Sequence, residues 1–230
     1  MKKNLIIGLF AFVSIFMFSG CIDFLEDITY HRNGSGSYKF TVDMGAVKSL
    51  LDSFGDDEEK KKEKDPMADM NKTFSELEKN LEKVPGISHF KSIEDTAAYV
   101  FGFSFDFKNA DALDKALHEQ NDKLSASTKL FSGGKRIFSR FNAGSLAEAM
   151  KDELAGDDSN DEDMEMVKSM FGDMKLRTVY HFDRKVKSSS NPNSQISADY
   201  KQVTLDYYFF KPELNKGDQG VGTVIKLKRR

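Results

Sequence analysis

The stretch YVFGFSFDF, residues 99–107, constrains the fold most strongly because an aromatic residue occupies every second position. Successive side chains of an extended chain point to opposite sides, so one face of a strand would carry five rings, those of Tyr99, Phe101, Phe103, Phe105 and Phe107. Such a row is typical of the core face of a central strand packed by other elements. The alternative interpretation is that the row lines the cavity of an apolar ligand.

Several other segments have the alternating pattern and turn residues of β-hairpins. The segment ITYHRNGSGSYKFTVD alternates on both sides of Asn33-Gly34, which favours a tight turn. A second hairpin is expected about Ser132-Gly133-Gly134. The last third of the chain adds strand-like segments at 175–182, 195–199, 201–210 and 221–228. The segment 187–194, KSSSNPNS, is expected to be a loop between hairpin strands.

Amphipathic helices are expected between these strands. Apolar residues at helical spacing mark 44–54, 67–84, 109–124, 145–154 and 161–171, with Asn109 as a helix cap. Hairpins mixed with helices, without regular βαβ alternation, indicate an α+β fold. We therefore expect a largely antiparallel twisted sheet with about four to five amphipathic helices packed on it, in a single domain over residues 28–230.

The N-terminus has the anatomy of an export signal. Lys2 and Lys3 precede the apolar run 5–18, and small Ser19 and Gly20 follow it. The alternatives are an uncleaved anchor helix, because no charge occurs between Lys3 and Asp23, and plain secretion. Residues 1–20 are thus expected to be a cleaved signal peptide, and residues 21–27 a tether.

The one cysteine of the chain lies at the end of this segment. The sequence FSGC, Phe18, Ser19, Gly20 and Cys21, resembles the lipobox of bacterial lipoprotein precursors, although Phe18 stands where an aliphatic residue is usual. The resemblance implies signal recognition at residues 18–20, a diacylglyceryl and palmitate lipid anchor on Cys21 and cleavage before it. The domain would then lie outside the cytoplasm, on the cell membrane or the outer membrane, and the sequence leaves open which.

Two further stretches carry a second resemblance. NGSGSYKFTVD near the start and FDRKVKSSSNPNSQISADYKQVTLDYYF near the end are similar to the LppM-type domain of envelope lipoproteins. This resemblance covers the two ends of the mature chain and rests on turn-and-strand pattern. It implies an α+β, membrane-proximal domain with a lipid or envelope ligand, and it supplies no catalytic residue.

Charge and motif spacing argue against several function classes. Residues 21–230 carry 32 basic and 37 acidic side chains, which argues against a nucleic-acid partner. The four histidines lack zinc-ligand spacing, and the acidic stretch 157–165 lacks the turn glycine and terminal glutamate of a calcium loop. We see neither the frame of a nucleophile elbow nor a phosphate-binding loop. The expectation is no catalytic residue, no metal and no cofactor.

These observations favour a membrane-anchored envelope lipoprotein with a non-catalytic binding or assembly role. One alternative is a carrier of an apolar, lipid-like ligand, and a less favoured one is an envelope hydrolase. The expected partners are the membrane, through acylated Cys21, and an envelope protein or a lipid ligand. The basic terminus KLKRR, residues 226–230, fits a polar chain end that protects an edge strand better than a contact with an anionic membrane.

Overall fold

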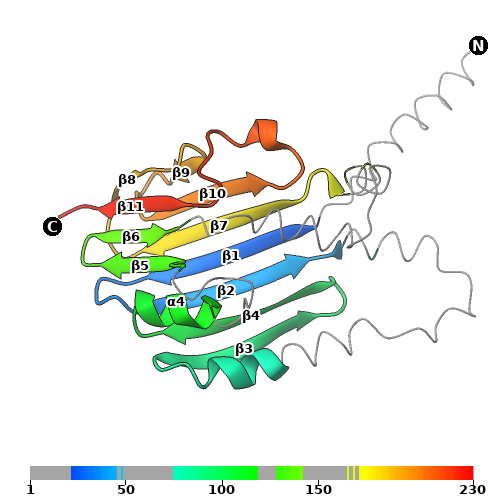
Figure 1. The fold of residues 1–230 in the computed structure, drawn as a ribbon, viewed down its shortest axis with the longest axis horizontal. Helices are drawn as coiled ribbons and strands as arrows, with labels where there is room; N and C mark the ends of the chain where they lie inside the picture. Colours follow the sequence, from blue (N-terminus) through cyan, green and yellow to red (C-terminus); the bar gives the residue numbers. More distant parts are fainter. Residues whose placement is uncertain are drawn as a thin grey trace, which may run out of the picture.

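A computed structural model describes residues 22–45, 48, 75–118, 128–141, 165, 168 and 171–229. These residues form two β-sheets, short helical segments and a 3-10 turn (Figure 1). The seven-stranded sheet has the order β3 (Ile87–Asp95), β4 (Val100–Phe107), β2 (Gly36–Asp43), β1 (Asp23–Tyr30), β7 (Lys175–Phe182), β10 (Gln202–Tyr208) and β9 (Ser194–Ile196). The four-stranded sheet has the order β5 (Phe131–Gly134), β6 (Ile137–Arg140), β11 (Thr223–Leu227) and β8 (Val186–Ser189). The helical segments are residues 75–81, α4 (Ala110–His118) and η2 (Pro212–Leu214).

The expected α+β fold, with four to five helices packed on one sheet, is wrong for the described residues. Strands account for 47% of them, and the helical segments are few and short. The physical reason is that a second sheet, together with α4, covers the apolar face of the large sheet. The helix expected at 145–154, and most of those at 44–54 and 161–171, lie outside the described residues, whereas residues 75–81 of the helix expected at 67–84 are helical.

The first hairpin forms where the sequence predicts it. Gly34 adopts a φ of +92°, which a glycine accommodates without strain, and the Asn33 side chain accepts a hydrogen bond from the Ser35 amide at 3.1 Å. The two strands pair antiparallel in register from Asp23 with Asp43 to Tyr30 with Gly36. The first strand begins at Asp23 and not at Ile28, so residues 23–27, expected as part of a tether, belong to β1.

Strand β1 lies in the interior of the large sheet because it pairs on its other side with a distant strand. It runs parallel to β7, with Asp23 beside Lys175 and Tyr30 beside Phe182. The remaining neighbours in this sheet pair antiparallel. One parallel pair therefore joins an N-terminal half of the sheet to a C-terminal half.

Two local expectations were wrong in detail. The turn of the second hairpin is Lys135-Arg136, and Gly133 lies within β5, where a Cβ would come 2.4 Å from the Tyr30 hydroxyl. The segment expected as a loop at 187–194 contains most of β8. In both places the backbone pairs as strand within the small sheet, β5 with β6 and β8 with β11.

Helix α4 confirms the described part of the helix expected at 109–124. The Asn109 side chain accepts a hydrogen bond from the Ala112 amide at 2.9 Å and so caps its first turn. Its apolar side, with Leu113 and Ala116 fully buried, packs against the core. The Asp114 side chain on another side accepts hydrogen bonds from the amides of Leu130 and Phe131, which ties the helix to β5.

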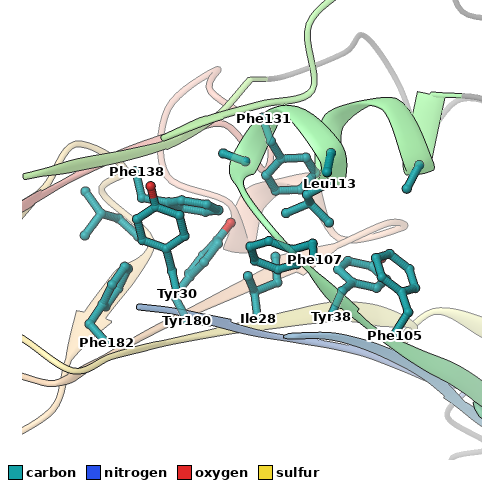
Figure 2. Packing of buried hydrophobic residues seen from close by; sticks show 14 of the residues in the cluster. Ile28, Tyr30, Tyr38, Phe105, Phe107, Leu113, Phe131, Phe138, Tyr180 and Phe182 are labelled. Atoms are coloured by element: carbon teal, nitrogen blue, oxygen red, sulfur yellow. The ribbon is translucent and has the colours of Figure 1, made fainter. Parts of the chain in front are cut away.

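The main core lies between the two sheets and is rich in aromatic rings (Figure 2). Phe138 of the small sheet packs against Tyr30, Tyr180 and Phe182 of the large sheet, with ring centroids 4.7–6.3 Å apart. A second apolar cluster lies at the end of the large sheet where β1 begins, and its buried members are Ile22, Met174, Leu176, Phe209 and Val221.

Candidate functional site

The predicted lipidation and signal residues, Phe18, Ser19, Gly20 and Cys21, lie outside the described residues. The residue that follows them is described and is fixed in the core. Ile22 is 8% exposed and packs in the cluster of Met174 and Phe209, and β1 begins at the next residue. The attachment point predicted at Cys21 is therefore one residue from the sheet.

The predicted aromatic row forms in β4 with one exception. Phe101, Phe105 and Phe107 are buried, and the latter two belong to the main core. Tyr99 lies before the strand with a left-handed φ of +55°, and its carbonyl accepts a hydrogen bond from the Met44 amide. Four of the five residues thus share one face, and for Phe105 and Phe107 that face is packed core.

Phe103, the remaining member of the row, belongs to a set of rings that are only partly buried. Its ring lies 6.0 Å from that of Phe40 and 6.1 Å from that of Phe90, and Phe24 stacks on Phe40 at 6.1 Å. All four side chains are of intermediate exposure. Phe24, Phe40 and Phe103 come from the inner face of neighbouring strands, so they form a continuous aromatic surface, which we call the aromatic ladder (Phe24, Phe40, Phe90 and Phe103).

A buried ion pair joins the two sheets beside this ladder. Glu26 on β1 is 3% exposed, and it contacts the guanidinium of Arg140 on β6, which is 11% exposed. The Thr178 hydroxyl donates to Glu26 Oε2 at 3.0 Å, and the Tyr38 hydroxyl donates to Glu26 Oε1 at 3.0 Å. Both carboxylate oxygens of Glu26 are therefore satisfied, as burial of a charge requires.

Burial keeps the two tyrosines around the pair protonated, whereas Arg140 stays charged in spite of burial. Burial raises the pKa of Tyr38 far above its usual value, so this phenol stays protonated and donates to Glu26. Burial also raises the pKa of Tyr180, an effect that the neighbouring Arg140 charge partly offsets. Burial lowers the pKa of Arg140, but arginine starts high enough to remain charged. The Tyr180 hydroxyl lies beside the Arg140 guanidinium but makes no hydrogen bond of good geometry within the described part of the chain.

This arrangement supports a structural link between the sheets better than a reaction centre. The Glu26 carboxylate already accepts from three groups, so it has little remaining capacity to act as a base, and Arg140 spans from the small sheet to two strands of the large one. The sequence interpretation missed the pair because it began the first strand at Ile28. The alternation Phe24-Glu26-Ile28-Tyr30 would have placed an acidic residue on the apolar face and revealed it.

Histidine–carboxylate pairs occur on the opposite, solvent-facing side of the large sheet. His181 Nε2 lies 3.2 Å from Asp27 Oδ2, and His89 Nδ1 lies 2.9 Å from Asp106 Oδ2. Asp183, two residues from His181, instead accepts a hydrogen bond from the Arg32 amide. Within the described ranges no group of three or more His, Cys, Asp or Glu side chains has the arrangement of a metal site.

The acidic stretch 157–165 lies outside the described residues apart from Glu165. In the part of the chain that the structure describes, none of the helices is both long and apolar enough to cross a membrane.

Comparisons with known proteins found little similarity. No protein-family model matches the chain, and no curated protein sequence matches it. Among solved structures, the folded domain of the Mycobacterium tuberculosis protein LppM is similar with a TM-score of 0.42 and 9% identity, over 92% of each chain. This domain is of the type that the turn-and-strand pattern resembles, but at this TM-score the likeness carries no argument about fold or function.

Proposed function

We propose that the protein is a membrane-anchored envelope lipoprotein with a non-catalytic binding or assembly role. The observation that supports the proposal is the packing of Ile22 in the core, because a chain acylated at the preceding residue would have its lipid within one residue of the sheet. A single residue spans at most about 3.6 Å, so an acyl group on Cys21 would hold the domain against the membrane surface. The lipobox-like FSGC supplies the chemistry of attachment, and the domain supplies a rigid body fixed to it.

The test is the chemical state of the mature N-terminus. The full chain is expressed in a bacterium, extracted from membranes in mild detergent and examined by intact mass and peptide mass spectrometry. We expect a chain that begins at Cys21 and carries a diacylglyceryl group, and a Cys21→Ser variant that keeps residues 1–20 and incorporates no labelled palmitate. A mature chain that begins at another residue, or an unmodified Cys21 thiol, would contradict the proposal.

A non-catalytic role is supported by the saturation of the buried pair. Glu26 accepts from Arg140, Thr178 and Tyr38 at once, which stabilises a carboxylate and leaves it poorly suited to proton transfer. The histidine pairs on the outer face are exposed and have no hydrogen bond to a serine, threonine or cysteine side chain among the described residues. Detection of a hydrolytic activity that His181→Gln abolishes would overturn this part of the proposal.

The aromatic ladder supports a second candidate, carriage of an apolar ligand. Its four rings are partly buried and lie on the inner face of the large sheet, next to the half that the small sheet covers. An apolar ligand would remove their remaining exposed area from water. The probe is a pyrene-labelled fatty acid, whose emission changes on entering an apolar site.

A matched pair of variants gives this test its specificity. Phe103→Ser changes the centre of the ladder, whereas Phe141→Ser changes a phenylalanine that is 41% exposed elsewhere. Carriage predicts weaker probe binding for Phe103→Ser and unchanged binding for Phe141→Ser, with both variants still folded by circular dichroism. If both variants bind the probe as well as the wild type does, the carriage hypothesis is rejected and the anchored, non-catalytic role remains the proposal.

A further inference from the structure

A strong concentration of positive charge lies at one end of the molecule. Five segments, 31–35, 135–136, 183–187, 199–201 and 226–229, contain ten lysines or arginines and two aspartates, a formal charge of +8. The chain as a whole carries −3, so all its other residues together carry −11. We call these segments the basic end, and its basic residues are Arg32, Lys135, Arg136, Arg184, Lys185, Lys187, Lys201, Lys226, Lys228 and Arg229.

Backbone hydrogen bonds bring the five segments together. The Leu227 amide donates to the Arg136 carbonyl at 2.9 Å, and the Lys228 amide donates to the Lys185 carbonyl at 2.8 Å. The Phe182 amide donates to the Lys201 carbonyl at 2.9 Å. The first turn joins them through the Arg32 amide, which donates to Asp183. The charges are therefore neighbours in space although 194 positions separate Arg32 from Lys226.

The positive charge at this end is largely uncompensated. Nine of the ten basic side chains are exposed, and Arg184 is partly buried. Both aspartates already accept hydrogen bonds. Asp183 accepts from the Arg32 amide of the first turn, and Asp199 accepts from the Ser197 hydroxyl and the Lys201 amide of its own turn. Among the described residues, Arg184 has a carboxylate within 4.0 Å, that of Asp183, and the other nine have none.

Apolar side chains are exposed at the same end. Ile137 follows the Lys135-Arg136 turn and is 41% exposed, and Tyr200 is 47% exposed with the Lys228 ammonium 4.8 Å from its ring centroid. Ile196, 37% exposed, lies on β9 just before the 197–201 turn. Lysine and arginine beside exposed tyrosine and aliphatic residues are typical of surfaces that bind anionic phospholipid headgroups and the adjoining interface.

The basic end is opposite the predicted anchor. Strand β1 starts beside Ile22 and ends at the 31–35 turn, and the other turns of the basic end and the C-terminus lie at that same side (Figure 1). Eight extended residues span about 26 Å. If the proposed anchor at Cys21 holds the other end at its membrane, a tether of one residue cannot turn the basic end back to that membrane.

We propose that the basic end docks on the anionic phospholipid headgroups of a second bilayer, facing the one in which the protein is anchored. The choice of a second, facing bilayer rests on the proposed lipid anchor. The affinity of the basic end for anionic lipid rests on its charges alone. The sequence interpretation favoured a polar chain end for 226–230. The structure adds seven basic residues from other segments to the same surface, and this larger cluster favours contact with an anionic membrane.

The experiment uses the full, membrane-extracted protein and two populations of vesicles. The protein is first incorporated into phosphatidylcholine vesicles, and its retention on flotation reports on the lipid anchor. Vesicles of equal parts phosphatidylcholine and phosphatidylglycerol are then added, and tethering is measured by light scattering. If the protein is not retained by the first vesicles, its direct binding to the phosphatidylglycerol vesicles is measured by flotation, so failure of the anchor and failure of the basic end are distinguished.

Two variants that each lose four positive charges distinguish the effect of the basic end on binding from the effect of net charge. One replaces Lys135, Lys185, Lys187 and Lys226 by glutamine, and the control replaces the exposed Lys39, Lys79, Lys91 and Lys216 by glutamine. Each cation near an anionic surface contributes a several-fold increase in affinity, so the first variant should weaken binding by about 100-fold or more. The control should bind within about threefold of the wild type, since its lysines lie away from the basic end.

Raising the salt concentration should release the wild-type protein from the phosphatidylglycerol vesicles, because salt screens the attraction between opposite charges. Equal binding by the two variants would overturn the proposal. So would binding to inorganic polyphosphate without binding to phosphatidylglycerol vesicles, which would make the partner a soluble polyanion.

Discussion

Glu26–Arg140 and Arg177–Asp206 pair the same two chemical groups on opposite faces of the seven-stranded sheet. The first pair lies on the inner face with side chains 3% and 11% exposed. The second lies on the outer face, bidentate at 2.7 and 2.8 Å, with side chains 48% and 24% exposed. Judged by geometry alone, the outer pair should contribute strongly to stability. However, water screens this pair and solvates either partner if the other is removed.

The comparison teaches that the contribution of a contact to stability depends on what surrounds it. On the inner face, loss of one partner leaves an uncompensated charge among aromatic rings. On the outer face, loss of one partner leaves a charge that water accepts. Four measurements of the free energy of unfolding test this difference.

The largest effect is expected when the buried pair is broken from one side. Arg140→Met should reduce the free energy of unfolding by about 3–5 kcal/mol, because Glu26 stays buried without its counter-charge. Urea unfolding of the variant and the wild type measures the loss. The double variant Glu26→Leu with Arg140→Met should recover at least half of it. A loss below about 1 kcal/mol for the single variant would show that Glu26 reaches water.

Alkaline pH should weaken the inner face through its buried phenols. Burial raises the pKa of Tyr38 and Tyr180 in the folded protein, whereas in the unfolded chain they ionise near pH ~10. Their contribution is therefore fully present below that pH and is lost as pH rises above it, by up to about 1.4 kcal/mol per pH unit for each tyrosine.

Urea midpoints between neutral and alkaline pH measure this slope. The double variant Tyr38→Phe with Tyr180→Phe should flatten it, and Tyr200→Phe, at a tyrosine 47% exposed, should leave it as in the wild type. A slope that the double variant does not change would assign the alkaline loss to other groups.

Removing one hydroxyl at a time should separate the two buried tyrosines. Tyr38→Phe takes a donor from Glu26 and should cost about 1–3 kcal/mol. Tyr180→Phe removes a hydroxyl that lies beside Arg140 but makes no hydrogen bond of good geometry among the described residues, so it should cost less than Tyr38→Phe. Both variants are measured by urea unfolding at neutral pH. Equal losses would mean that the Tyr180 hydroxyl is hydrogen-bonded in solution.

The smallest effect is expected on the outer face. Arg177→Met makes the same side-chain change as Arg140→Met but at an exposed pair, and it should cost about 0.2–1 kcal/mol. The loss should shrink further at high salt, since exposed charges are screened. A loss as large as that of Arg140→Met would remove the distinction between the two faces.

Local features of the fold were predictable from the sequence where the signal was strong and short-range. Asn33-Gly34, the aromatic alternation in β4 and the Asn109 cap each specify their own backbone conformation. Strand β3 was missed because it is an edge strand whose side chains are mostly exposed, so ISHFKSIED shows little apolar alternation. The parallel pairing of β1 with β7 leaves no local signal, since its partners are far apart in the sequence.

The same division between short-range features, which the sequence reveals, and long-range contacts, which it does not, applies to the site residues. Cys21 stands out in sequence because it is the one cysteine at the end of an apolar run, and its acylation stays a prediction. Glu26 and Arg140, 114 positions apart, become partners only when two sheets close over each other. The basic end likewise depends on five segments that meet in space, of which one, 226–229, belongs to a cluster of basic residues that is recognisable in the sequence, 226–230.

The parallel pairing of β1 with β7 also has a consequence for the time course of folding. Asp23 and Lys175 are neighbours in the sheet, although 152 positions separate them in the chain. A ribosome that adds about 5–20 residues per second needs roughly 8–30 s to make the chain between them. Through that interval β1 can pair with β2, but its other edge has no partner. The sheet therefore closes late, after most of the chain has been made, and an exported chain would have that interval in which to reach the translocation machinery before folding.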